Sequence, residues 1–81
     1  MEKNHNISSI VRFHRKKAGL SQHGLAKLAG VGKTAVFDLE KGKETIQLDT
    51  LRKILRVLNI EMRLESPLRQ DYEREVPDEE S

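Results

Sequence analysis

Apolar residues over the first two thirds of the chain recur at intervals of three and four, the period of an amphipathic helix. Gly19, Gly30 and Gly42 divide this region into segments, and glycine commonly ends a helix because it adopts the left-handed conformation there. Four helices are therefore expected between residues 7 and 58, which makes the predicted fold all-α.

The helix starts and the inward faces follow from the same pattern. The first helix begins after Asn6 or Ser8 and the second after Ser21, since these side chains can cap a first turn. The third helix follows Gly32, and the fourth begins at about Leu48. The residues on the helical stripes are Ile7, Ile10, Val11, His14, Ala18, Leu25, Ala26, Leu28, Ala29, Val36, Leu39, Leu51, Ile54, Leu55 and Leu58.

The pattern changes after the fourth helix. Ile60, Met62 and Leu64 alternate with charged residues, as in a half-buried strand, and Pro67 ends the alternation. A single strand has no partner in an otherwise helical chain, and unpaired strand edges seek partners. Residues 59–66 are therefore expected to pair with the same strand of a second copy in a homodimer.

Residues 67–81 contain too few apolar side chains for a core, so an acidic flexible tail is expected. Tyr72 and Val76 lie four positions apart and could form one face of a short helix on a partner. The expected organisation is an N-terminal extension at 1–6, a helical domain at 7–58, the strand at 59–66 and this tail.

Composition sets limits on the function. The 81 residues suffice for one small domain, and the chain has no cysteine for a disulfide or a cysteine-containing zinc site. Neither a signal-peptide pattern nor an apolar stretch of about 20 residues is present, so a cytoplasmic protein that does not enter membranes is expected.

The net charge of +2 hides an uneven distribution, because residues 1–65 carry +6 and residues 66–81 carry −4. A basic domain followed by an acidic tail favours a polyanion as the partner of the domain. Solvated surface charge explains the composition equally well.

The segment from Leu20 to Lys43 is the most informative, because it predicts two short helices joined at Gly30–Val31–Gly32. Ala26 is expected at their closest approach, where a larger side chain would separate them, and Gly30 can adopt the positive φ of a tight turn. These are the requirements of a helix-turn-helix, whose second helix enters the major groove of DNA through its N-terminal residues.

The segment resembles the Cro/CI (Xre) family of helix-turn-helix DNA-binding proteins. The typical Gly-Leu-Ser-Gln, Leu-Ala, Gly-Val and Glu-x-Gly-Lys of that family stand here at Gly19–Gln22, Leu25–Ala26, Gly30–Val31 and Glu40–Lys43, in matching register. With the flanking helices the resemblance covers residues 7–58. It implies a lambda-repressor-like fold and sequence-specific binding of double-stranded DNA.

Residues 45–64 further resemble HipB-like antitoxins, in which a strand that pairs across a dimer follows the fourth helix. The resemblance implies a homodimer that binds a palindromic operator, represses its own operon and holds a HipA-like kinase toxin. Two alternatives remain open: a stand-alone phage-type or Xre transcriptional regulator, and a protein-binding adaptor whose DNA contact is secondary. None of the three is an enzyme or requires a cofactor.

The resemblance also implies DNA-binding roles for individual residues. Gln22 occupies the position that contacts a backbone phosphate and braces the recognition helix. Lys33 and Thr34 occupy base-contacting positions, where Lys can donate to guanine O6 and N7 and Thr can touch a thymine methyl group. Phe37 could pack on a thymine methyl group or make a minor core contact.

The remaining positions of the motif carry charges. Asp38 could accept a hydrogen bond from cytosine N4 or repel phosphates in a wrong register. Lys41 and Lys43 match positions that contact phosphates, which position a protein on DNA without selecting a sequence. Arg15 and Glu40 match a family pair that forms a largely buried salt bridge between the first and third helices.

Three other kinds of site can be set aside. Gly30–Thr34 resembles the end of a phosphate-binding P-loop, but that motif needs glycine where Lys27 stands, and it must follow a buried strand. The carboxylate pair Asp78–Glu79 lies in the tail, where no cleft would alter its chemistry. A metal site is not expected because the three histidines do not share a helical face and lack accompanying cysteines: His5, His14 and His23.

Overall fold

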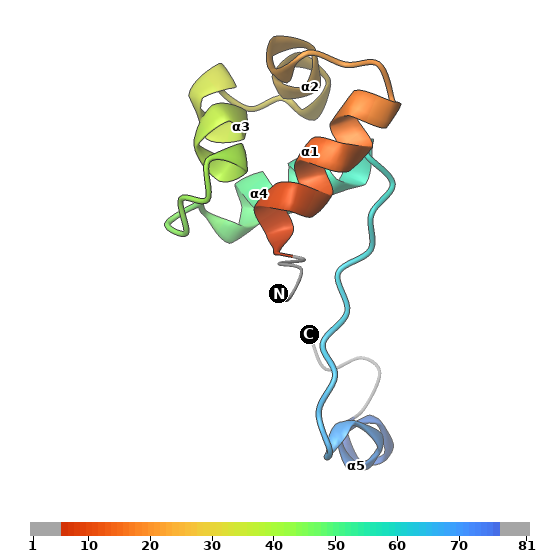
Figure 1. The fold of residues 1–81 in the computed structure, drawn as a ribbon. Helices are drawn as coiled ribbons and strands as arrows, with labels where there is room; N and C mark the ends of the chain where they lie inside the picture. The colour runs from red at the N-terminus through yellow and green to blue at the C-terminus, as the bar shows by residue number, and fades with distance from the viewer. Residues whose placement is uncertain (1–5, 77–81) are drawn as a thin grey trace, which may run out of the picture.

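The computed structural model describes residues 6–76, which form five helices (Figure 1). The helices are α1 (Ile7–Lys17), α2 (Gln22–Ala29), α3 (Lys33–Glu40), α4 (Leu48–Val57) and α5 (Arg69–Glu75). Most of the expected N-terminal extension, with His5, and the carboxylate pair Asp78–Glu79 lie outside the described residues.

Local hydrogen bonds determine where the first helices start and stop. Asn6 Oδ1 accepts from the backbone amide of Ser9 at 3.0 Å, so Asn6 rather than Ser8 caps α1. Ser21 Oγ accepts from the amide of Gly24 at 2.9 Å and caps α2. Gly30 ends α2 with a φ of 74°, the left-handed conformation that turns the chain toward α3.

Helices α1 to α4 pack around one aliphatic core and are called the body below. Each of the four contributes one fully buried side chain: Val11, Leu25, Val36 and Ile54. Ala26 in α2 is 2% exposed, and α2 packs against both α3 and α4. The small side chain of Ala26 permits this close packing.

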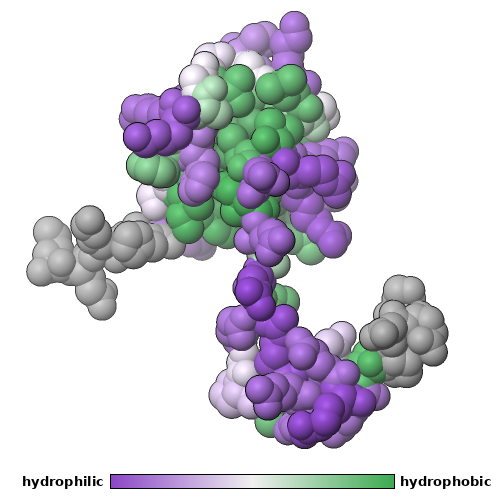
Figure 2. Space-filling view, turned by 90° about the vertical axis from the view of Figure 1, so that its right-hand side faces the viewer, coloured by the Kyte–Doolittle hydropathy of each residue, from purple (hydrophilic) through white to green (hydrophobic). Residues whose placement is uncertain are grey.

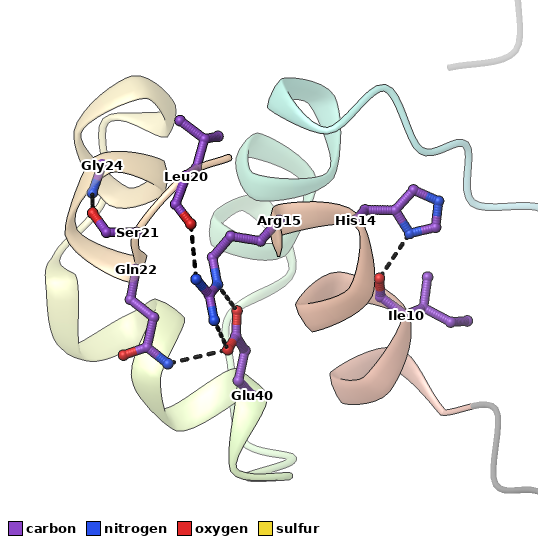
Figure 3. A network of polar contacts seen from close by, with 8 residues as sticks. All are labelled: Ile10, His14, Arg15, Leu20, Ser21, Gln22, Gly24 and Glu40. Carbon is purple, nitrogen blue, oxygen red and sulfur yellow. Dashed lines mark hydrogen bonds and ion pairs between the residues drawn. The ribbon is translucent and has the colours of Figure 1, made fainter. Parts of the chain in front are cut away.

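Four positions of the expected apolar stripes are exposed instead of buried. They lie at the ends or edges of short helices, where few residues can reach the neighbouring helix: Ile7, His14, Ala18 and Leu28. His14 keeps its ring in position through Nδ1, which lies 2.8 Å from the carbonyl oxygen of Ile10 (Figure 3).

The chain leaves α4 through a turn at Asn59, whose φ of 61° is left-handed, and the amide of Ile60 donates to the carbonyl of Leu55 at 2.9 Å. Residues 6–76 form no strand, because a ladder of hydrogen bonds needs a second strand. Ile60 packs against the core, whereas Met62 and Leu64 are 47% and 81% exposed.

The prediction of four helices missed α5, which stands apart from the body in Figure 1 and has no buried residue. Arg69 holds this segment together. Its Nε donates to Glu73 at 2.8 Å, while its Nη1 donates to Glu65 at 2.8 Å and to the carbonyl oxygen of Leu64 at 3.0 Å. Local ion pairs therefore order part of the segment that was expected to be flexible.

Candidate nucleic-acid interface

The first turns of α2 and α3 lie beside one another and line a shallow hollow of about 480 Å³. We call it the α2–α3 hollow. Two of its residues come from α2 and three from α3: Gln22, His23, Lys33, Thr34 and Phe37. Four of these were predicted to contact DNA, and the fold brings them together on one surface.

The hollow is suited to an anion. Neither α2 nor α3 has an acidic residue in its first turn, so the positive ends of both helix dipoles are not neutralised there. Gly32 precedes α3 without a side-chain cap, which leaves the first amides of α3 available to an outside acceptor. The exposed side chain of Lys33 adds a full positive charge to the same turn.

Phe37 is 46% exposed and faces outward from α3, rather than into the core. The ammonium group of Lys41 lies 5.0 Å from the centroid of its ring, within the range of a cation–π contact. This contact holds a positive charge next to an apolar surface, the combination that a phosphate and a thymine methyl group require.

Asp38 and Lys43 lie beyond the α2–α3 hollow, near the other end of α3. Lys43 Nζ is 3.6 Å from Asp38 Oδ2, and both residues line a smaller pocket of about 180 Å³ with residues 45–47. An exposed pair of this kind is weak. The side chain of Lys43 is 61% exposed, so its ammonium group is not committed to Asp38.

A buried ion pair joins α1 and α3 (Figure 3). Arg15 Nε donates to Glu40 Oε2 at 2.6 Å and Nη2 donates to Oε1 at 3.0 Å, which gives the two-pronged geometry of a strong pair. Arg15 Nη1 also donates to the carbonyl oxygen of Leu20 at 2.8 Å. The two side chains are only 10% and 4% exposed, so the pair ties α1 to α3 inside the body.

Gln22 connects this pair to the hollow, because its Nε2 donates to Glu40 Oε1 at 3.1 Å. Burial alone raises the pKa of the Glu40 carboxyl, but the hydrogen bonds from Arg15 and Gln22 outweigh it, and the pKa lies below its usual value. The hydrogen bonds that Arg15 donates to Glu40 also raise the pKa of the Arg15 guanidinium. Both groups therefore stay charged near neutral pH.

Sequence reasoning did not find two features of this surface. His23 had been considered only as a metal ligand, but it lines the hollow between the two helix starts. Its position directly after Gln22, which was predicted to contact a phosphate, was the available signal. The hydrogen bond from Gln22 to Glu40 had no signal in the sequence, because it joins residues 18 positions apart through the fold.

Two short helices that meet at a left-handed glycine, with their first turns exposed side by side, define a helix-turn-helix protein. The family model described as Helix-turn-helix matches residues 11–64. An HTH-type transcriptional regulator of Sinorhizobium fredii is 37% identical over 62 residues, which cover 76% of this chain and 82% of that protein. One of Methanothermobacter thermautotrophicus is 38% identical over 55 residues, covering 68% and 80%.

The chain therefore belongs to the Cro/CI-type helix-turn-helix family. Solved structures of HipB share its fold. The chain from a HipA-HipB-O2-O3 complex superposes with a TM-score of 0.68 at 24% identity, over 83% of this chain and 99% of that one. The chain from a HipB-O1-O2 complex has a TM-score of 0.67 at 25% identity, over 82% and 100%.

No helix among residues 6–76 has the length and apolar character needed to cross a membrane.

Proposed function

We propose that the chain is a sequence-specific DNA-binding repressor, whose homodimer binds a palindromic operator and controls its own operon. The observation that carries this proposal is the α2–α3 hollow. It joins a cation, three polar side chains and the positive ends of two helices on one exposed surface. The family membership of the chain and the regulator names of its relatives support it.

On this proposal the side chains divide into two groups. Lys33 and Thr34 contact base edges in the major groove, with Phe37 and Asp38 beside them on α3. The phosphate contacts flank them on both sides and come from Gln22, His23, Lys41 and Lys43. The start of α2 and the residues after α3 would thereby contact the DNA backbone, while the first turn of α3 selects the sequence.

The homodimer in this proposal forms through residues 59–66. Met62 and Leu64 are exposed in the single chain, and the backbone around them makes no ladder within residues 6–76. Antiparallel pairing with a second copy would satisfy that backbone and cover both side chains. It would also relate the two recognition helices by a two-fold axis, as a palindromic operator requires.

The test is binding of the purified protein to the promoter of its own gene and to random duplex of equal length, at 50 and 200 mM salt. Phosphate contacts weaken with salt for every sequence, whereas base contacts preserve the difference between sequences. A specific complex of one dimer per palindrome, retained at 200 mM, is expected. Equal, weak binding to both duplexes would overturn the proposal.

We further propose that the protein is the antitoxin of a HipA-like kinase. Its fold matches that of HipB in a HipA-HipB-O2-O3 complex, and the match extends beyond the helix-turn-helix to 83% of this chain. The test is co-expression with a HipA-like kinase encoded beside its gene. Co-purification and relief of kinase toxicity are expected, and a neighbourhood without such a gene would leave the regulator role alone standing.

A further inference from the structure

Helix α5 and the residues at its two ends carry an apolar stripe that residues 6–76 leave largely exposed. Leu68 and Tyr72 are 66% and 63% exposed, and Val76 continues the stripe at the end of the helix, since positions four apart share a face. A helix of seven residues is too short to be stable through its own hydrogen bonds. The hydrogen bonds of Arg69 to Glu73 and Glu65 already order the helix. The stripe is therefore formed before any surface buries it.

The flanks of this stripe are acidic. Asp71, Glu73 and Glu75 lie on α5, where Arg69 pairs with Glu73 and Arg74 with Asp71. Residues 66–81 together still carry a net charge of −4. A surface that complements α5 therefore needs an apolar floor and a basic rim.

The body offers such a surface beside α4, a groove of about 340 Å³ between the second half of α4 and the residues that follow it. Its rim has two arginines and one carboxylate, so its net charge is positive. Neither arginine makes an ion pair within the part of the chain that the structure describes. The apolar side chains that line the groove are Leu55, Ile60 and Met62, and the charged ones are Arg52, Arg56 and Glu61.

The course of the chain favours the groove of a second copy. Figure 1 shows the segment after α4 leading away from its own body toward α5. Figure 2 shows apolar side chains gathered on the side of the body from which this segment leaves, and a mostly polar α5 below it. A chain that continues outward in this way reaches a neighbouring molecule more directly than its own α4.

Pairing of residues 60–64 brings the two elements together. In an antiparallel pair centred on Met62, Leu64 of one copy lies opposite the partner's Ile60, at the edge of the groove. Leu68 is four residues further on, a distance of at most about 14 Å for an extended chain. The apolar stripe of α5 therefore begins within reach of the groove of the other copy.

We propose that α5 of each copy docks its Leu68–Tyr72–Val76 stripe into the α4 groove of the second copy, with its acidic flanks against Arg52 and Arg56. This inference rests on the proposed homodimer and adds a second, side-chain interface to the paired strands. The α4 groove of each protomer would then be covered by α5 of the other.

Crosslinking tests the contact directly, because the chain has no cysteine of its own. Two differently tagged proteins, one with Tyr72→Cys and one with Arg56→Cys, are mixed, allowed to exchange subunits and oxidised. A disulfide requires the two Cβ atoms to approach within about 4.5 Å. The mixed crosslink is expected in most of the exchanged dimers. Gln70→Cys, on the other side of α5, is the matched control and should give at least tenfold less.

Fluorescence provides a second measurement on the full chain. Tyr72 is the only tyrosine and there is no tryptophan, so its emission reports on α5 alone. Reversing the rim with Arg52→Glu and Arg56→Glu is expected to raise acrylamide quenching of Tyr72 about threefold. Equal quenching in both proteins would contradict the docking.

The outcomes separate this inference from the proposed function. A protein that sediments as a dimer and binds its operator, but gives no mixed crosslink, would overturn the docking and leave the repressor in place. Closure of the disulfide within one chain, in a protein carrying both cysteines, would place α5 on its own body and also overturn it. A monomer without operator binding would overturn both.

Discussion

Removal of the Glu40 carboxylate should be among the most damaging single changes to the folded body. Glu40→Ala leaves the guanidinium of Arg15 inside the body, with its side chain only 10% exposed and two of its donors without their acceptor. The carbonyl oxygen of Leu20 would be its single remaining partner of those the structure places there. Breaking one partner of such a buried pair costs about 3–5 kcal/mol.

This loss is large relative to the total free energy of unfolding. A domain of 81 residues unfolds with a free energy of about 4–12 kcal/mol. Each kcal/mol lowers the Tm of a domain this size by roughly 4–8 °C, so a fall of roughly 12–40 °C is expected. The measurement is thermal and urea unfolding followed by circular dichroism, at one fixed protein concentration because a dimer gains stability from association.

Two matched variants control the interpretation. Arg15→Met with Glu40→Leu replaces both charges by apolar side chains and should recover most of the loss, since no stranded charge remains. Lys43→Met removes the exposed pair with Asp38 and should cost no more than about 1 kcal/mol. If Glu40→Ala cost as little as Lys43→Met, the pair would not be the buried connection between α1 and α3 described above.

Further predictions concern binding, assembly and pH. Lys33→Ala should cost about 1–3 kcal/mol of operator binding and relax the preference at one base pair, whereas Lys43→Ala should weaken all duplexes alike and reduce the salt slope by about 1; identical specificity profiles for the two variants would refute the assignment. Met62→Lys should give a monomer in sedimentation, and an unchanged dimer would exclude the strand interface. The folded pKa of Glu40 is lowered, so the stability from its ionised form is complete above the unfolded pKa of about 4.3 and is lost as the pH falls through the folded value. The stability difference between wild type and Glu40→Gln should therefore be constant from pH 6 to 8 and shrink below about pH 4. Urea titrations across that range would check this.

The sequence predicted the helical body because its signals are local. Spacing by three and four, the cap at Ser21 and the left-handed Gly30 each depend on a few neighbouring residues, and the structure has α1 to α4 where these signals place them. Helix α5 was missed because its stabilising contacts are charged rather than apolar. The i, i+4 pairs of Arg69 with Glu65 and Glu73 were present in the sequence as a weaker signal of the same kind.

The candidate interface could be predicted only at positions that the family motif aligns. Gln22, Lys33, Thr34 and Phe37 were named from their positions in the motif, and the fold gathers them in one hollow. The direction of Phe37 was undetermined by spacing, because residues beside a helix stripe can face either way. Pairing of residues 59–66 between copies stays a prediction, since it depends on a second chain.

Gln22 gives the interface a further property. Its amide has two donor hydrogens, one of which goes to Glu40. In the proposed DNA complex, the side chain would therefore already be held in one rotamer, with its second hydrogen available for a phosphate. Immobilising a side chain on binding costs about 0.5–1.5 kcal/mol, and here folding has met that cost beforehand. Glu40 would thus pre-organise the proposed phosphate contact of Gln22, which Glu40 does not itself make. Substitutions at this buried carboxylate should weaken operator binding even in variants restored to full stability.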